Sequence, residues 1–273
     1  MSFLLALLAQ VGPAVSPGVG PPLPSQTIPE ASLPTRAPPA CPDMTNPVDT
    51  ADAASEWLAT AKGAERAKAG ECLGVALSTL ERWDEAASAF QAARADADRP
   101  EWRARLGAMA GEAALHAGEP ADALAAFDAA RADAAKVEGG GDPALAGGIA
   151  LFRARALVAL DREAEAAVAL EEARKAAPNS AQAWLLSATL SRRMGKLAEA
   201  QQQIERAFDL RPVDLQVGVE AGVIAVLSGR DEAARKSWQS VVSAAPDSAE
   251  AATARDYLAQ LGGASARPME EGR

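Results

Sequence analysis

Two cysteines and one histidine are the side chains of this sequence best suited to covalent or acid–base chemistry. The thiols of Cys41 and Cys72 lie 31 positions apart and could form a disulfide in an oxidising compartment. Such a bond would pin the residues ahead of the first helix to the helical part of the chain, and would stabilise the fold by about 3–4 kcal/mol. The alternative is a pair of free thiols. We favour the disulfide if the chain is exported.

The sequence predicts no catalytic residue, no metal site and no cofactor. His116 has no serine or cysteine at a spacing that indicates a nucleophile, and a single histidine needs partners for catalysis. Cys41, Cys72 and His116 do not have the spacing of metal ligands. Three consecutive glycines within residues 137–148 could suggest a phosphate loop, but the Gly-Lys-Ser/Thr that such a loop requires does not follow.

Composition argues against a nucleic-acid partner and indicates closely packed helices. The net charge is −10 and the isoelectric point is about 4.8, whereas binding to a phosphate backbone calls for a basic stripe. Hydrophobic residues make up 49% of the chain but aromatic residues only 4%. Much of the apolar fraction is alanine, whose small side chain lets helices approach one another closely.

The N-terminal region resembles an export signal followed by a linker. The apolar run from Phe3 to Leu8 is too short to span a bilayer and is followed by small residues, which is typical of a signal peptide. No lysine or arginine precedes it, so only the terminal amine supplies positive charge. We expect a signal peptide over 1–16, a Pro-rich disordered linker over 17–48 and no membrane span in the mature chain. The alternative is the hydrophobic N-terminus of a cytosolic protein.

A repeated phrase organises the rest of the chain. Pro178, Pro212 and Pro246 are 34 residues apart, and ahead of each an alanine is followed by a large apolar residue four positions later and a small one three positions after that. The phrase occurs five times, as Ala86-Phe90-Ala93, Ala123-Phe127-Ala130, Ala166-Leu170-Ala173, Ala200-Ile204-Ala207 and Ala234-Trp238-Val241. A small residue stands twelve positions before each phrase, at Gly74, Gly111, Ala154, Ala188 and Gly222.

This spacing predicts pairs of helices. Steps of four and three place the phrase residues on one helical face, and the small residue upstream lets the two helices of a pair come close. The large residue then fills the remaining space between them. A turn signal separates the two helices of each pair, at Glu81, Gly118, Asp161, Gly195 and Gly229.

These residues resemble the tetratricopeptide repeat (TPR) family. The best match is 181–214, which carries Trp184, Ala188, Gly195, Ala200, Ile204, Ala207 and Pro212, with Ser191 where the family has tyrosine. The resemblance implies an all-α fold, a right-handed α-solenoid of about five TPR-like helix pairs with capping helices at both ends. The alternative is an alanine-rich helical bundle with accidental periodicity.

The resemblance also implies an order of domains along the chain. We expect an N-terminal capping helix with two TPR-like repeats over 49–136 and a Gly-rich joint over 137–146. Three regular repeats and a C-terminal capping helix, ended by Gly262 and Gly263, should follow over 147–263. A disordered tail should occupy 264–273.

In this family the first helices of successive pairs line a concave groove in which partners bind. Carried over by alignment, the groove has three arginines near its middle, an apolar stripe beside them and Gln182. The arginines are Arg155, Arg192 and Arg193, and the stripe comprises Leu151, Val158, Leu185, Val219, Val223 and Val226. Because arginine suits carboxylates, we expect a partner segment with apolar side chains and an acidic group. The alternative is that the apolar residues pack between repeats and the arginines are solvated.

The resemblance implies a non-catalytic protein–protein interaction scaffold or adaptor with a protein or peptide partner. With the predicted signal peptide, its place would be the bacterial periplasm, in envelope assembly, division or secretion. The alternative is a cytoplasmic regulatory subunit that acts on a separate catalytic chain. An enzyme is least favoured, because no segment outside the repeats is large enough to form a catalytic domain.

Overall fold

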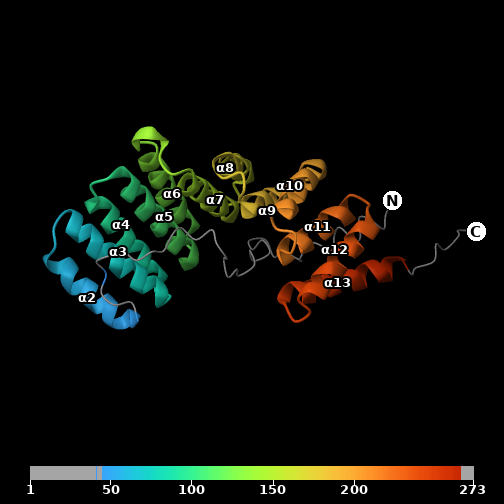
Figure 1. The fold of residues 1–273 in the computed structure, drawn as a ribbon, viewed down its shortest axis with the longest axis horizontal. Helices are drawn as coiled ribbons and strands as arrows, with labels where there is room; N and C mark the ends of the chain where they lie inside the picture. Colours follow the sequence, from blue (N-terminus) through green and yellow to red (C-terminus); the bar gives the residue numbers. More distant parts are fainter. Residues whose placement is uncertain (1–40, 42–44, 266–273) are drawn as a thin grey trace, which may run out of the picture. The chain divides into compact units, whose positions relative to one another are not determined.

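The computed structural model describes Cys41 and residues 45–265, and over these residues the chain is all-helical, as predicted (Figure 1). The described part contains twelve α-helices and one short 3-10 turn, and no strand. The predicted signal peptide over 1–16 lies outside the described residues, as does most of the predicted linker over 17–48. Beyond Ser265 the predicted tail also lies outside them.

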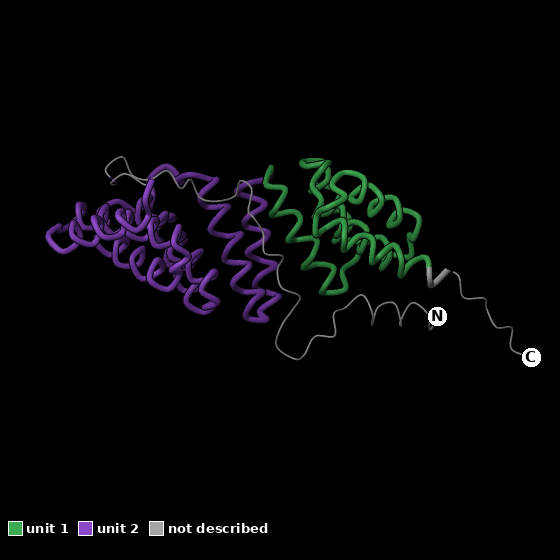
Figure 2. Tube along the Cα trace, turned by 90° about the horizontal axis from the view of Figure 1, so that it is seen from below, with its two compact units in different colours: residues 1–27, 179–273 green, residues 28–178 purple. Residues whose placement is uncertain are grey.

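The described helices belong to two compact units, which Figure 2 draws in different colours. The first unit ends at Pro178 and contains α2 (Pro47–Thr60), α3 (Ala64–Thr79), α4 (Trp83–Asp96), α5 (Pro100–Ala117), α6 (Pro120–Ala134), α7 (Pro143–Ala159) and α8 (Glu163–Ala176). The second unit contains α9 (Ala181–Arg193), α10 (Leu197–Leu210), α11 (Leu215–Leu227), α12 (Asp231–Ala244) and α13 (Ala249–Ser265).

Within each unit every helix packs on the next one in the chain. The first helix of each predicted pair is α3, α5, α7, α9 or α11, and the second helix is α4, α6, α8, α10 or α12. First helices also contact one another inside a unit, α5 with α7 and α9 with α11. The helices α2 and α13 pack on α3 and α12, in the places expected for the capping helices.

The boundary between the two units does not coincide with the Gly-rich joint expected over 137–146. It falls after Pro178, and the glycine-rich segment lies inside the first unit, where Glu138–Gly140 forms the 3-10 turn. The reason is that α6 and α7 pack directly on each other across this segment. The additional residues lengthen a loop without separating the helices that it connects.

The predicted close approach of the two helices in a pair is confirmed at three glycines. A Cβ atom added to Gly74 would lie 2.5 Å from the ring of Phe90, and one added to Gly111 would lie 2.6 Å from the ring of Phe127. The same atom on Gly222 would lie 2.1 Å from the indole nitrogen of Trp238. Real Cβ atoms do not approach other atoms so closely, so each aromatic ring occupies the space that a side chain would need.

The two remaining pairs use a different combination of sizes. Where the first helix has alanine, at Ala154 and Ala188, the second helix has an aliphatic residue, Leu170 and Ile204. All four of these side chains are buried. Glycine therefore accompanies an aromatic ring and alanine a smaller side chain, which keeps the packed volume between the helices similar in all five pairs.

Enlarging one member of such a combination should destabilise the protein. We expect Gly111→Ala to lower the free energy of unfolding by about 1–3 kcal/mol, because the new methyl group collides with the Phe127 ring. Adding Phe127→Leu gives the alanine–leucine combination found in the α7–α8 pair. The double variant should therefore lose less free energy of unfolding than the sum of the losses of the two single variants. Urea unfolding of the four proteins measures this coupling, and strictly additive losses would contradict the size rule.

The turn within each pair has the same hydrogen bond. A backbone N–H just past the turn donates to the carbonyl five residues earlier, as in Arg82 to Leu77 at 2.9 Å and Lys196 to Ser191 at 2.8 Å. Such a turn needs a residue with positive φ. Gly118 supplies it at φ 82°, and Glu81 and Asp161 adopt it at φ 56° and 57°, which is uncommon for residues with a Cβ atom. The two acidic residues thus form the turns that the repeat predicts.

Helix ends follow local chemistry, with one correction to the prediction. The helices α8, α10 and α12 end two residues before Pro178, Pro212 and Pro246, as the proline signal indicates. The prediction that Gly262 and Gly263 stop the last helix is wrong, because α13 continues to Ser265. Each glycine costs a helix only about 1 kcal/mol relative to alanine and keeps its N–H donor, so the helix continues through both.

Candidate binding surface

The candidate surface consists of the side chains of the first helices that are not buried, taken separately in each unit. In the first unit these belong to α3, α5 and α7, and in the second unit to α9 and α11. In the first unit Asp142 accepts hydrogen bonds at the start of α7, and in the second unit Ser180 and Asp214 do so at the starts of α9 and α11. These caps fix where three of the five helices begin.

Most of the predicted apolar stripe is packed inside the units. Leu151, Leu185 and Val223 are 2%, 8% and 5% exposed, and Val226 is also buried. Val219 is half-buried against the cluster that contains Trp238. For these residues the structure favours the alternative interpretation, in which they belong to the packing of the repeats. The physical reason is that Leu185 packs with residues of α10 and α11, and Val223 and Val226 pack with residues of α12 and α13.

Two of the three predicted arginines lie in the second unit and one in the first, so their gathering into one cluster stays a prediction. The guanidinium of Arg192 donates from Nε to Glu220 Oε1 at 2.6 Å, joining α9 to α11. Because both side chains are largely buried, this pair neutralises the charge of Arg192 within the protein itself. Arg193 is exposed at the end of α9, and Gln182 is half-buried in its first turn.

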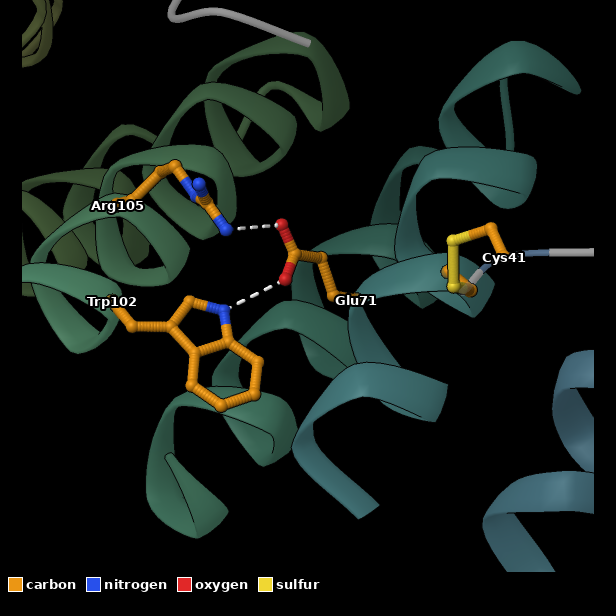
Figure 3. The surroundings of a disulfide bond; sticks show 5 residues. Cys41, Glu71, Trp102 and Arg105 are labelled. Atoms are coloured by element: carbon orange, nitrogen blue, oxygen red, sulfur yellow. Dashed lines mark hydrogen bonds and ion pairs between the residues drawn. A yellow bond between two sulfur atoms is a disulfide. The ribbon is translucent and has the colours of Figure 1, made fainter. Parts of the chain in front are cut away.

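A similar pair joins α3 to α5 in the first unit. The carboxylate of Glu71 is 2% exposed and accepts hydrogen bonds from Trp102 Nε1 at 2.7 Å and from Arg105 Nη2 at 2.8 Å. Figure 3 shows Glu71 pointing toward both donors on α5. One charged donor and one neutral donor on the next first helix satisfy this buried carboxylate, so we interpret Glu71 as part of the structure.

The disulfide lies beside this pair. Cys72 follows Glu71 in α3 and is fully buried, Cys41 is half-buried, and their sulfur atoms are bonded with the Cα atoms 5.5 Å apart (Figure 3). The bond fixes the chain ahead of α2 to the middle of α3. Its presence agrees with the pairing expected for an exported chain.

The contact between α5 and α7 differs from the other two. Glu112 on α5 and Arg155 on α7 are half-buried and interact electrostatically, but within the described residues neither makes a hydrogen bond or a direct ion pair. The Arg155 guanidinium instead lies 5.2 Å from the ring centre of the buried Phe152. One helical turn beyond Glu112, the ring of His116 stacks on Trp83 with centroids 4.4 Å apart.

Burial shifts the pKa of each ionisable group in this cluster. It raises the pKa of Glu112, and the charge of Arg155 only partly opposes this. It lowers the pKa of Arg155, which the charge of Glu112 partly opposes. It also lowers the pKa of His116, and the nearby Arg155 charge adds to this effect. The cluster therefore keeps two charges in a poorly solvated position without direct neutralisation.

The raised pKa of Glu112 has a consequence for stability. Because the pKa of Glu112 is higher in the folded chain than in the unfolded chain, folding favours the neutral carboxyl group. The stability that this gives is fully present below the pKa of the unfolded chain and is lost as the pH rises through the pKa of the folded chain. We therefore expect Glu112→Gln to raise the Tm at pH 7, with the gain disappearing near pH 4, where the carboxyl group is neutral in both states. Thermal unfolding at both pH values measures this, with the exposed Glu101→Gln as a control for lost charge. A lower Tm for Glu112→Gln at pH 7 would contradict the interpretation.

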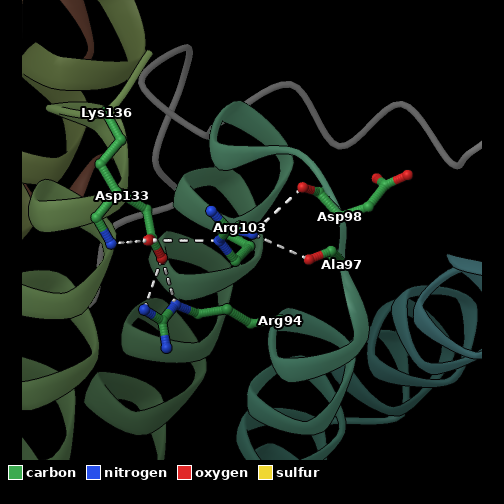
Figure 4. A network of polar contacts seen from close by, with 6 residues as sticks. All are labelled: Arg94, Ala97, Asp98, Arg103, Asp133 and Lys136. Atoms are coloured by element: carbon green, nitrogen blue, oxygen red, sulfur yellow. Dashed lines mark hydrogen bonds and ion pairs between the residues drawn. The ribbon is translucent and has the colours of Figure 1, made fainter. Parts of the chain in front are cut away.

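A second polar network lies in the first unit and joins α4, α5 and α6. The carboxylate of Asp133 is 2% exposed and accepts from Arg94 at 2.6 and 2.9 Å, from Lys136 at 3.1 Å and from Arg103 at 3.5 Å (Figure 4). Burial alone would raise the pKa of Asp133, but the hydrogen bonds from Lys136 and Arg94 outweigh it and lower the pKa. Since every group here is satisfied, we interpret this network as structural.

Alignment to the family makes Glu112 a groove residue of the second pair, but the sequence alone did not join Glu112 to Arg155. The sequence does show that the two residues have the same place in consecutive repeats, because Glu112 follows Gly111 and Arg155 follows Ala154. The described residues contain no group of three or more His, Cys, Asp and Glu side chains that could hold a metal ion. Among the described helices, none is long and apolar enough to cross a membrane.

No protein-family model matches the chain, and no curated protein sequence matches it either. Solved structures do. PilF of Pseudomonas aeruginosa has a TM-score of 0.62 at 15% identity, covering 79% of this chain and 90% of its own. PilW, described as a widely conserved type IV pilus biogenesis factor, has a TM-score of 0.61 at 19% identity, covering 76% and 90%.

A third similar structure is YrrB, described as a TPR protein with an unusual peptide-binding site. Its TM-score is 0.56 at 19% identity, and the match covers 76% of this chain and 99% of YrrB. Identities this low establish the fold alone. Together with the helix pairs and their turns, they show that the chain has the all-α, TPR-like solenoid fold that the repeat predicts.

Proposed function

We propose that this protein is a non-catalytic interaction scaffold that binds an extended segment of a partner protein along its first helices. The observation that carries the proposal is the α5–α7 contact, where Glu112 and Arg155 are half-buried without a direct internal partner. Elsewhere the comparable charges are paired within the chain, as Glu71 is with Arg105 and Arg192 with Glu220. Charges kept poorly solvated and unpaired are typical of positions where a ligand completes the contacts.

The similar structures support the same class of function. YrrB is described as having a peptide-binding site, and this chain has the same fold. Fold alone does not define a function, so the proposal depends on the α5–α7 contact and takes from YrrB only the kind of ligand.

Reversal of one charge tests the proposal. Arg155→Glu should remove a defined set of proteins from those captured by the tagged chain, because it places a second negative charge beside Glu112. The matched control is Arg206→Glu, which makes the same change of charge at an exposed position on the second helix α10. Capture from native extract followed by quantitative mass spectrometry compares the three proteins. Equal recovery of every captured protein would contradict the proposal.

We further propose that the protein works outside the cytoplasm, in the bacterial periplasm, in envelope assembly, division or secretion. The disulfide between Cys41 and Cys72 supports this, because such bonds persist in oxidising compartments. The apolar run at Phe3–Leu8 supports it from the sequence. PilW, which shares the fold, is described as a type IV pilus biogenesis factor.

Fractionation of cells that produce a C-terminally tagged full chain tests the compartment. The expected result is a tagged protein in the periplasmic fraction, shortened by removal of the N-terminal segment, whose mass rises on alkylation only after reduction. Recovery wholly in the cytosol at full length, with both thiols open to alkylation, would contradict export. That result would favour the alternative, a cytoplasmic regulatory subunit that acts on a separate catalytic chain.

A further inference from the structure

The C-terminal capping helix α13 is held by apolar and aromatic packing. Leu261 is 3% exposed, and Leu258 packs against the cluster of buried residues that contains Trp238. The ring of Tyr257 lies 5.1 Å from the ring of Trp238, measured between centroids. Because buried apolar area is the main favourable term in helix packing, these contacts account for how α13 is held on α12.

The N-terminal capping helix α2 has less packing of this kind. Its buried side chains are those of Thr50, Ala51 and Ala54, all of them small. Trp57 and Leu58, its two largest apolar side chains, are only half-buried. Since hydrophobic stabilisation is roughly proportional to the apolar area removed from water, packing holds α2 less firmly than α13.

The disulfide constrains this weakly packed helix. Cys41 precedes α2 and Cys72 lies in the middle of α3, so the bond closes a loop that contains the whole of α2. When α2 opens, it must remain within this closed loop, which leaves it fewer conformations than a free end would have. The bond therefore opposes the opening of α2 in particular.

The helix α3, in contrast, has contacts that do not involve either sulfur atom. Glu71 accepts from Trp102 and Arg105 of α5 at 2.7 and 2.8 Å (Figure 3). Gly74 lies against the ring of Phe90 on α4, so closely that a Cβ atom would not fit between them. These contacts hold α3 on α4 and α5 whether or not the disulfide is intact.

We propose that the disulfide between Cys41 and Cys72 is a reducible latch on α2. In the oxidised chain the latch keeps α2 on α3. After reduction by a dithiol, α2 opens separately while the rest of the first unit stays folded, which uncovers the side of α3 on which α2 packs. This redox-sensitive device is additional to the proposed scaffold function and does not depend on it.

Accessibility assigns the sulfur atom that the reductant attacks, because Cys72 is 0% exposed and Cys41 is half-buried. A thiolate of the dithiol attacks Sγ of Cys41, the sulfur–sulfur bond breaks, and Sγ of Cys72 leaves with the electron pair and takes up a proton. The second thiol then attacks the reductant's own sulfur in the mixed disulfide and releases the thiol of Cys41. Two electrons and two protons pass to the protein, and the dithiol becomes a disulfide.

Hydrogen–deuterium exchange of the purified full chain, before and after treatment with dithiothreitol under native conditions, tests the latch. We expect the amides of 47–60 to exchange at least about tenfold faster after reduction, because the released segment regains conformational freedom. The amides of α5, α6 and α13 should exchange at unchanged rates. Reoxidation should restore the protection of α2.

Two variants separate the latch from a general loosening of the fold. Cys41→Ser should show fast exchange of α2 without dithiothreitol and no response to it. Tyr257→Ala should accelerate the exchange of α13 equally in the oxidised and the reduced chain, because packing holds that helix. Glutathione, a monothiol, stops at the mixed disulfide, and mass mapping should find it on Cys41.

Four results would overturn the proposal. Unchanged exchange of α2 after reduction would show that packing alone holds this helix. Equal acceleration from α2 to α6 would show that the bond stabilises the whole unit. Reduction that succeeds only in denaturant would show that the bond does not react in the folded chain. Glutathione found on Cys72 would contradict the assigned point of attack.

Discussion

Replacement of Asp133 by alanine should lower the free energy of unfolding by about 3–5 kcal/mol, because it removes the shared acceptor of a buried charge network. Arg94, Arg103 and Lys136 all direct donors at this one carboxylate, and together they join α4, α5 and α6. Without it, two guanidinium groups that are about 30% exposed lose their counterion and repel each other. Urea unfolding monitored by circular dichroism measures the loss.

An exposed ion pair provides the control for Asp133. Glu85 accepts from Arg82 at 2.6 Å with both side chains more than half exposed, so Glu85→Ala should destabilise the chain far less than Asp133→Ala. Equal losses for the two variants would show that the Asp133 network is no more than a surface contact.

The network also implies a dependence on pH. The pKa of Asp133 is lowered in the folded chain, so its stabilising contribution is present above the unfolded pKa and is lost as the pH falls through the folded pKa. The difference in stability between the unaltered chain and Asp133→Ala should therefore shrink in acid.

Loss of the disulfide should have the second large effect. In the chain-entropy model a loop of this length contributes about 3–4 kcal/mol, so Cys41→Ser should lower the free energy of unfolding by that amount. We choose Cys41 because it is only half-buried, whereas a serine at the fully buried Cys72 would add a desolvation cost. Unfolding in urea with and without reductant measures the contribution.

The reductant gives the disulfide experiment its internal control. Reduction should destabilise the unaltered chain to the level of Cys41→Ser and should leave Cys41→Ser itself unchanged. If reduction has no effect on the unaltered chain, the cross-link does not constrain the unfolded state.

Much of the fold could be predicted from one local pattern. The alanine phrase and the small residue twelve positions before it define each helix pair, because helix contacts depend on residues at fixed spacing along one face. Glycine at Gly111 opposite Phe127 shows how directly residue size specifies the approach of two helices. The unusual turns at Glu81 and Asp161 were also predictable, because they occupy the place that glycine has in the other pairs.

The remaining features depend on relations between helices that local sequence does not express. The Asp133 network joins residues as far as 39 positions apart, and its partners follow from how three helices cross. The pairing of Arg192 with Glu220 likewise depends on side-chain directions across α9 and α11. A leucine or valine on a first helix can either pack between helices or contact a partner, and the sequence does not distinguish the two. For this reason the sequence placed Leu185 and Val223 in a groove, whereas in the structure both side chains are buried.

Photo-crosslinking from defined positions tests the central claim most directly, namely that partners bind along the first helices. A photoreactive amino acid replaces one residue at a time in the full chain, at half-buried first-helix positions in one set and at exposed second-helix positions in the other. The first set is Val75, Leu115 and Val158, and the second is Ser88, Ala125 and Val168. If partners bind along the first helices, the first set should give the same partner adducts and the second set should give none of them. Adducts from the second set alone, or equally from both, would contradict that claim.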